Sequence, residues 1–450
     1  MRASLTVLAL FASTPSAQVA DDPVPHRRGA AAFAEDGVRV IHEIVGENPG
    51  DQFGWVGRDM GDLDGDGVRD FALTAPSFGA NQSWAGKAYF YSGRSAELLH
   101  TRVGAPADRY GNGVSGQFDA NGDEQLDVLV GAPAWGERPG YAQVLDGASG
   151  EVLLRLSMEE PGDEFGLKVS GLDDLDGDGC AELAIGAPKA DANGADSGAV
   201  HVYSGKEGAY LYTIAGAAAG DGFGSAVGGT TGGAHGLLVV GAMKGGPAKK
   251  GRCSIYRLSA EDYELVAHVD ADATGACLGQ YFAAPMGDVD GDGTPDLLFS
   301  DWNNAAGGPN TGRVYVHSGA DGSRLLSIDG SGPGQGFGTS ISVAGDATGD
   351  GVADLIVGAW QFGAHAASGG RCTLHSGADG ARLASWSAVD AGETLGFDAV
   401  GVGDVDGDGG VDFLLTSAWS GLGGARTGRA WVVAGPIFEQ EEAGAEDAER

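Results

Sequence analysis

The feature that most constrains the fold of this chain is an acidic pattern that returns at a nearly constant interval. Its first copy, DLDGDGVRD, spans Asp62–Asp70 and has aspartate at positions 1, 3, 5 and 9. Further copies begin at positions 119, 174, 288, 346 and 404, so the steps are 57 (119 − 62), 55 (174 − 119), 114 (288 − 174), 58 (346 − 288) and 58 (404 − 346) residues. Such a period predicts a repeat protein in which each unit is one supersecondary motif stacked on its neighbours.

The long step of 114 residues covers two intervals, so one unit has lost the acidic pattern. That unit is recognisable from its flanks, because Phe223-Gly224 and the apolar stretch Val239–Met243 keep the spacing of the other units. Where aspartates would stand, it reads GTTGGAHG. Seven units of about 57 residues therefore fill Val38 to Gly435.

Each unit has the internal order of four short strands. An aromatic–glycine pair leads into a strand, the acidic loop and an apolar strand; a third strand such as KAYFYSG, a tight turn and a fourth such as ELLHTRV follow. Four antiparallel strands repeated radially form a propeller blade. Val38–Val45 resembles a fourth strand and Arg429–Ala434 a third, and their pairing would close the ring and remove two exposed edges. The sequence predicts an all-β, seven-bladed propeller.

The acidic loops have the chemistry of calcium sites. Ca²⁺ takes six to eight oxygen ligands, and side chains at positions 1, 3 and 5 with a carbonyl at position 7 wrap the ion, while Gly at position 6 allows the turn. Here position 9 is acidic, position 12 is apolar and the flanks are strands, so we expect a hairpin site rather than a helix–loop–helix site. A solvated Asx-turn is the alternative for one copy, whereas six copies in one frame favour metal.

The predicted ligands, for up to six Ca²⁺ ions, are the side chains at positions 1, 3, 5 and 9 and the carbonyl at position 7. They are Asp62, Asp64, Asp66, Val68 and Asp70; Asp119, Asn121, Asp123, Gln125 and Asp127; Asp174, Asp176, Asp178, Cys180 and Glu182; Asp288, Asp290, Asp292, Thr294 and Asp296; Asp346, Thr348, Asp350, Val352 and Asp354; and Asp404, Asp406, Asp408, Gly410 and Asp412. We expect the second and fifth loops to bind more weakly. In the second, Asn121 replaces a carboxylate and Glu124 replaces the turn glycine, and in the fifth Thr348 replaces a carboxylate. Calcium is expected to be structural, because an ion that binds only the folded state offsets the repulsion among these carboxylates.

The combination of an F-G pair, D-x-D-x-D-G-x-x-D and G-A-P at constant offsets resembles the FG-GAP repeats of the integrin alpha-subunit head and of secreted bacterial relatives. Phe165-Gly166, Asp174–Glu182 and Gly186-Ala187-Pro188 show it within one unit, with Glu182 in place of the last aspartate. The resemblance implies a seven-bladed propeller with calcium between the first and second strands of several blades. It also implies that aromatic rings near the axis of the opposite face receive a basic side chain from a partner.

Large aromatic residues are concentrated where that opposite face is expected. The candidate partner-binding residues are Trp55, Phe78, Trp84, Trp135, Trp302, Trp360, Phe397 and Trp419. A cation–π cage is one interpretation. The other is that these rings fill blade interfaces or plug the central channel.

Composition narrows the class of function. A formal charge of −36 and a pI near 4.3 argue against nucleic acid and anionic membranes as partners. The nine histidines lack metal spacing, G-x-S-x-G is absent and the clustered carboxylates are committed to calcium. We therefore predict a monomeric binding or cell-adhesion scaffold, not an enzyme, with an extracellular protein or glycan as partner. A calcium-dependent polysaccharide lyase or glycoside hydrolase is the alternative.

The ends of the chain predict export. Residues 1–20 have an early Arg2, an apolar core and small residues near positions 17–20, as in a cleaved signal peptide, and no other stretch is apolar enough to span a bilayer. The protein is thus expected to be secreted, periplasmic or on the cell surface. Residues 21–36 are predicted to be a flexible linker, 37–435 the propeller and 436–450 an acidic disordered tail.

Four cysteines allow three pairings. Cys253 begins a third strand and Cys277 follows a fourth, which places both on the aromatic face. A disulfide between these two is predicted. Cys180 and Cys372 are expected to be unpaired.

Overall fold

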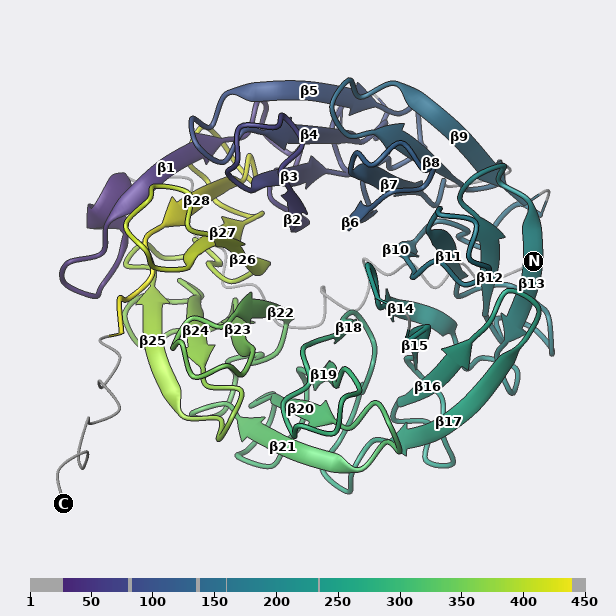
Figure 1. Ribbon diagram of the computed structural model, residues 1–450. Coiled ribbons are helices and arrows are strands. Elements are labelled where there is room, and N and C mark those ends of the chain that lie inside the picture. Colours follow the sequence, from purple (N-terminus) through teal and green to yellow (C-terminus); the bar gives the residue numbers. More distant parts are fainter. Residues whose placement is uncertain (1–26, 80–82, 135–137, 159, 234, 439–450) are drawn as a thin grey trace, which may run out of the picture.

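The strands of this protein form a closed ring of seven sheets. The computed structural model describes residues 27–79, 83–134, 138–158, 160–233 and 235–438. Within these ranges, 28 strands form seven four-stranded antiparallel sheets, and the described helical structure is a short 3₁₀ helix, η2 (Gly29–Ala32). The sheets are arranged radially with one strand of each nearest the axis (Figure 1). The predicted seven-bladed, all-β propeller is confirmed.

The blades are numbered in chain order, and the strands of each are given from the innermost outward. They are β2 (Gly57–Gly61), β3 (Asp70–Ala75), β4 (Lys87–Tyr91) and β5 (Leu98–Val103) in blade 1; β6 (Gly113–Phe118), β7 (Asp127–Ala132), β8 (Tyr141–Asp146) and β9 (Val152–Ser157) in blade 2; β10 (Lys168–Gly171), β11 (Glu182–Ala187), β12 (Ala199–Ser204) and β13 (Tyr210–Ala215) in blade 3; and β14 (Phe223–Gly229), β15 (Leu237–Ala242), β16 (Arg252–Leu258) and β17 (Tyr263–Asp270) in blade 4. Blade 5 has β18 (Ala283–Pro285), β19 (Leu297–Asp301), β20 (Arg313–His317) and β21 (Arg324–Asp329); blade 6 has β22 (Ser340–Gly345), β23 (Asp354–Ala359), β24 (Arg371–His375) and β25 (Arg382–Ser387); and blade 7 has β26 (Ala399–Gly403), β27 (Asp412–Ser417), β28 (Arg429–Val433) and β1 (Val40–Val45).

Burial explains the sequence of the strands. Every residue of β3, β11 and β15 is buried, because a second strand packs against the neighbouring blades on both of its faces. Such strands read as continuous apolar runs rather than alternating ones. Of the outer strands, β9 is largely exposed and β5 is mostly partly exposed. The core is therefore a set of apolar layers between adjacent blades, and the acidic loops cap their ends.

Blade 7 is built from both ends of the propeller. Strand β1 pairs with β28 in antiparallel register from Val40 opposite Val433 to Val45 opposite Arg429. Figure 1 shows the purple β1 beside the yellow β28. Gly428 permits the close passage at this seam, because it has φ of 84° and a Cβ there would lie 2.0 Å from the Phe53 carbonyl oxygen. The predicted ring closure is confirmed.

The segment before β1 differs from its prediction as a flexible linker. Ala32 and Phe33 are buried, and the Phe33 ring packs edge-on against Trp431 with centroids 5.4 Å apart. Phe33 also pairs with Ala388 in an isolated bridge, and the Glu35 carboxylate accepts a hydrogen bond from the Ser387 amide. The prediction is wrong for residues 29–35, because Phe33 in the alanine-rich stretch GAAAFAE docks at the junction of blades 6 and 7.

The predicted signal peptide at residues 1–20 and most of the predicted acidic tail lie outside the described residues. Within the described ranges, no helix has the length and apolar character needed to cross a membrane.

The predicted disulfide is wrong in this structure. Cys180, Cys253, Cys277 and Cys372 are all buried and unpaired. The Cys277 thiol donates to Asp301 Oδ1 at 3.3 Å, while Cys253 lies on β16 in the apolar layer between blades 4 and 5. The two thiols therefore have separate environments, although the sequence places both near the same face.

Candidate metal-binding loops

All six acidic loops lie on one face of the ring, because each connects the innermost strand of its blade to the second strand. We call this the acidic-loop face. The loops that follow second strands, and those that enter the next innermost strand, lie on the other side, which we call the opposite face. The turns between third and fourth strands also reach the acidic-loop face, where they contact the acidic loops.

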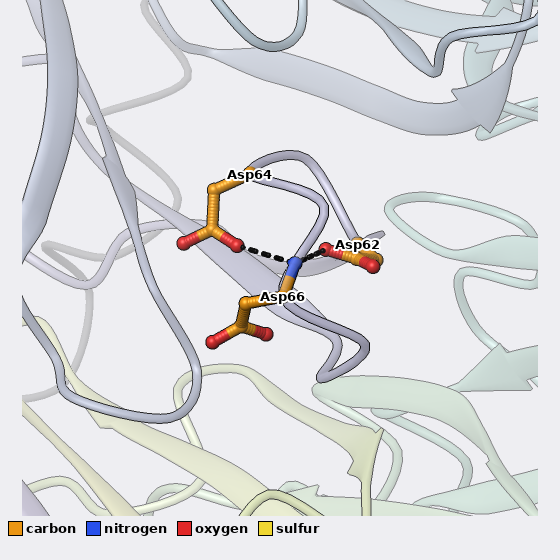
Figure 2. Close-up of side chains that lie close together, drawn as sticks. All are labelled: Asp62, Asp64 and Asp66. Atoms are coloured by element: carbon orange, nitrogen blue, oxygen red, sulfur yellow. Dashed lines mark hydrogen bonds between the residues drawn. The ribbon is translucent and has the colours of Figure 1, made fainter.

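The loop between β2 and β3 curls around its own carboxylates. Asp62 accepts hydrogen bonds from the amides of Gly65, Asp66 and Gly67 at 2.7, 3.1 and 2.9 Å. Asp64 Oδ1 accepts from the Asp66 amide at 3.1 Å. Figure 2 shows Asp62, Asp64 and Asp66 gathered about this short segment. Amide donors thus position the carboxylates near one another without neutralising them.

The same frame recurs in every acidic loop. The carboxylate at position 1 accepts from the amides at positions 4 and 6. These donors are Gly65 and Gly67, Gly122 and Glu124, Gly177 and Gly179, Gly291 and Gly293, Gly349 and Gly351, and Gly407 and Gly409. Position 6 is left-handed throughout, and Glu124 adopts φ of 65° where the other loops have glycine. A side chain in that conformation costs about 1–2 kcal/mol.

The carboxylate at position 9 anchors each loop to its blade. This residue is fully buried in all six blades; it begins the second strand in five of them and immediately precedes β19 in blade 5. One of its oxygens accepts from the amide at position 2, at distances between 2.5 and 2.9 Å. Burial raises the pKa of Asp127 and of Glu182 to about 7, and of Asp296 and Asp412 to about 6.

Two of these anchoring carboxylates have an oxygen without a partner. Asp127 Oδ1 and Glu182 Oε1 are buried and accept no hydrogen bond. In the other four loops the second oxygen accepts from a glycine amide that follows the third strand, as from Gly93 to Asp70 at 2.9 Å. A buried oxygen with no donor is costly unless a cation or water meets it.

In four loops, oxygens of three acidic side chains lie within 4.8 Å of one another. The groups are Asp62, Asp64 and Asp66; Asp174, Asp176 and Glu182; Asp288, Asp290 and Asp296; and Asp404, Asp406 and Asp412. Among the residues that the structure describes, the loops at 119–127 and 346–354 form no such group. These are the two loops in which Asn121 and Thr348 stand at position 3. The Thr348 hydroxyl is itself buried without a partner.

This donor set fits calcium. The converging side-chain atoms are all oxygens, which hard cations prefer. Ligand oxygens at 2.3–2.6 Å from one ion lie at most about 5.2 Å apart, so a spacing within 4.8 Å needs little rearrangement. The buried oxygens of Asp127, Glu182 and Thr348 without hydrogen-bond partners are also suited to accept a cation.

Three loops also contact a basic side chain that the sequence reasoning missed. Arg94 pairs with Asp66 at 2.6 Å and Lys206 with Asp178 at 3.3 Å, and Arg39 reaches Asp406 and Asp408. The signal for two of them is S-G-R and S-G-K after a third strand, since this turn meets the acidic loop. The basic side chains are half exposed, so solvent screens these ion pairs and they contribute little to stability.

On the opposite face, the structure brings four of the eight predicted aromatic residues together. Trp55 and Phe397 have centroids 4.8 Å apart, Trp360 and Trp419 are 4.9 Å apart, and Phe397 and Trp419 are 5.7 Å apart. Trp360 and Phe397 are buried, whereas Trp55 and Trp419 are partly exposed. Arg426 lies over Trp419 at 4.9 Å. We call these four rings the aromatic cluster.

The other predicted aromatic residues lie apart from this cluster. Trp302 stacks with Tyr281, and Phe78 lies beneath the Lys87 ammonium at 5.0 Å. Trp84 is partly buried and adopts φ of 49°. Trp135 lies outside the described residues. The eight residues therefore do not form one cage.

Comparison with known proteins adds the family relationship. The model of the FG-GAP repeat matches residues 59–91 and 165–203. The chain carries FG-GAP repeats. Among curated proteins, it is 32% identical over 167 residues to mouse integrin alpha-E, 28% over 158 residues to chicken integrin alpha-V and 31% over 161 residues to human integrin alpha-11. The predicted resemblance to integrin alpha subunits is confirmed.

These matches cover 33% of this FG-GAP chain but only 14–15% of each integrin subunit. A similarity also exists to the solved structure of the Dos1 propeller, with a TM-score of 0.46 and 12% identity over 83% of this chain and 77% of that one.

Proposed function

We propose that this FG-GAP propeller is an exported interaction scaffold, with calcium in the acidic loops and an extracellular protein or glycan on the opposite face. The observation that carries the calcium half of the proposal is the recurrence of one loop geometry six times. Four copies have converging carboxylates. The other two each have a buried oxygen without a partner, on Asp127 and Thr348, as does Glu182 in one of the four. Similarity to integrin alpha subunits supports a binding rather than a catalytic role.

Calcium would act on the fold itself. The residues at positions 1, 3, 5 and 9 would hold each ion, and the ion would supply positive charge at hairpin tips where carboxylates repel one another. Six ions would change the formal charge from −36 to −24 (−36 + 12). Because the position-9 residue is buried at the start of the second strand, or directly before it in blade 5, each ion would tie its loop to the buried layer of its blade.

The opposite face is the proposed contact surface for the partner. The aromatic cluster offers two partly exposed rings, Trp55 and Trp419, over two buried ones. Large rings of this kind dominate binding energy when they sit at the centre of an interface. Arg426 already occupies one side of Trp419, so Trp55 and the outer edge of Trp419 are the available surfaces.

The calcium half is tested by counting ions. Full-length protein freed of metal with chelator would be titrated with Ca²⁺ by calorimetry, and bound metal measured after dialysis. We expect between four and six ions per chain, and much weaker binding of Mg²⁺, which demands tighter octahedral geometry. Fewer than four ions would contradict the proposal.

The partner half is tested by capture from the native extracellular fraction with the calcium-loaded protein as bait. Trp55→Ala and Trp419→Ala should reduce recovery of the captured partner. Trp302→Ala is the matched control, since Trp302 is a partly buried ring on the same face outside the aromatic cluster. Equal recovery by all three variants would refute the assigned surface.

A further inference from the structure

The axis of the ring is a cavity with its own chemistry. It has a volume of about 550 Å³ and is lined by residues of all seven innermost strands or of the segments that enter them. Most of the wall is small or apolar, including Val56, Val114, Ile341 and Val400. Cavities of this size with a few placed polar groups are typical of small-molecule sites.

The charged residues that line this cavity are mostly basic, although the protein as a whole is strongly acidic. In a chain with formal charge −36, the charged lining residues are Arg58, Asp59, Arg69 and Lys168. At the acidic-loop end, Arg69 binds the Asp59 carboxylate through two nitrogens, at 2.5 and 2.9 Å, and these charges cancel. The excess positive charge therefore lies toward the opposite face.

At that end, Arg58 and Lys168 differ in their partners. Arg58 Nη1 pairs with the fully buried Asp398 carboxylate at 2.8 Å. Lys168 forms neither an ion pair nor a side-chain hydrogen bond among the described residues. Its ammonium lies 5.0 Å from the centre of the Phe282 ring. Burial and the nearby Arg58 charge lower the pKa of Lys168 to about 8, so the amine is largely protonated at neutral pH.

Phe282 reaches the cavity because blade 5 is irregular. Its segment from Leu278 to Asp288 is one residue longer (288 − 278 = 10) than the segment from Phe53 to Asp62 in blade 1 (62 − 53 = 9). Strand β18 has only three residues, the shortest innermost strand described. The Phe282 ring lies near both cations, 5.7 Å from Arg58 Cζ and 5.0 Å from Lys168 Nζ.

A partly buried cation without an acceptor costs free energy that a bound anion would recover. One unpaired positive charge suits a monoanion better than a phosphate dianion. The apolar wall beside it suits a carboxylate carried on an apolar body. We propose that the axial cavity binds a small organic carboxylate that enters from the opposite face, with its carboxylate on Lys168 and its apolar part against Phe282. This site goes beyond the calcium loops and the aromatic cluster and does not depend on either.

The probe for the test is 4-fluorobenzoate, observed by ¹⁹F NMR with the full chain in calcium at pH 7. Its neutral isostere 4-fluorobenzamide serves as the ligand control. We expect the amide to bind roughly tenfold more weakly than the carboxylate. Lys168→Met, which keeps the apolar stem, should weaken 4-fluorobenzoate binding by about the same factor.

The matched protein control is Lys244→Met, which changes the net charge equally at an exposed position on the same face. It should bind the probe like the unaltered protein. The source of a natural carboxylate is distinguished by a blocked Gly-Glu-Gly peptide: its binding through Lys168 would assign the site to an acidic side chain, and binding of 4-fluorobenzoate alone to a free acid. No binding of either probe, equal binding of amide and carboxylate, or unchanged binding by the Lys168→Met protein would overturn the proposal.

Discussion

Blades 1 and 4 hold the same hairpin loop by opposite means. In blade 1, the loop carries four carboxylates of its own at Asp62, Asp64, Asp66 and Asp70. In blade 4, the loop after Gly229 has none, and a single carboxylate from the neighbouring blade, Asp173, takes their place. Asp173 accepts from the Thr230 hydroxyl and from the amides of Gly233 and Gly236, at 2.8 and 2.9 Å for the two amides.

The difference is one of charge balance. Asp173 is buried and has three donors for one negative charge, so the blade 4 loop is satisfied by protein groups alone. The blade 1 loop concentrates four negative charges, and among the described residues it has one basic partner, the exposed Arg94. On the proposed calcium binding, loss of the acidic pattern in blade 4 exchanges dependence on an ion for dependence on the adjacent blade. The comparison predicts that calcium stabilises the six blades with acidic loops and leaves blade 4 unaffected.

The largest expected effect is that of chelation, because it acts on all six acidic loops at once. Removing calcium should lower the melting temperature by at least about ten degrees, since ligand binding to the folded state alone adds stability by mass action. The measurement is thermal unfolding by circular dichroism in excess chelator and in millimolar calcium. An identical melt in both would show that the acidic loops need no ion.

Asp173→Asn should destabilise the protein by about 2 kcal/mol, because a buried charged acceptor with three donors becomes a neutral one. The loss should be the same in calcium and in chelator. Unfolding in urea under both conditions measures it. A loss confined to the calcium sample would mean that Asp173 acts through a metal after all.

Asp174→Asn is the matched change one residue further on, at position 1 of an acidic loop. We expect it to remove one bound ion and to lower stability by about 1 kcal/mol in calcium. In chelator it should change stability little, because asparagine keeps one acceptor and removes one repelling charge. Equal effects in both conditions would erase the distinction between the two loop types.

Thr348→Asp should restore a carboxylate to a loop that lacks one at position 3. Calcium affinity rises with the number of charged ligands, so the weakest step of the calcium titration should tighten roughly tenfold. Thr294→Asp is the control, since Thr294 contributes only its backbone carbonyl in the proposed ligand set. If both variants bind equally, the ranking of the loops is incorrect.

Glu124→Gly should give the smallest effect, a gain of about 1 kcal/mol, because glycine accepts the left-handed backbone that glutamate occupies at φ of 65°. The gain should appear both with and without calcium. Chemical unfolding measures it, and a loss of stability would mean that the Glu124 side chain makes a favourable contact.

The propeller, and its closure by the pairing of β1 with β28, could be predicted because both follow from local patterns that repeat along the sequence. The acidic frame fixes one hairpin per unit, and apolar second strands fix burial on two faces. Glu124 illustrates how far this extends, since its backbone strain follows from the glycine found at the same place in other copies. The expected weaker binding of the loops at 119–127 and 346–354 rests likewise on Asn121 and Thr348, and stays a prediction. Among the described residues, these two loops form no group of three converging acidic side chains.

What could not be predicted depends on contacts between units. Asp173 precedes an acidic loop and looks like one more member of it, yet its carboxylate faces the next blade. Phe33 lies outside the repeat pattern, and only the assembled junction of blades 6 and 7 provides its apolar contact with Trp431. The predicted disulfide between Cys253 and Cys277 rested on their shared face. The direction of each side chain determines whether a disulfide forms, and these two thiols lie in separate environments. Lys168 gives no sign in the sequence that its ammonium would remain without an acceptor.

The shared sheet of blade 7 has a consequence for how the molecule is made. Strand β1 is synthesised before every other strand, but its partner β28 is the last. Until β28 is available, the backbone hydrogen-bonding groups of β1 remain unpaired, and blades 1 and 6 lack blade 7, which packs between them. Completion of the ring is thus a late, long-range step, and folding that depends on such distant contacts is slow. Until the ring closes, the open edge of β1 is available for pairing with another chain, which favours aggregation.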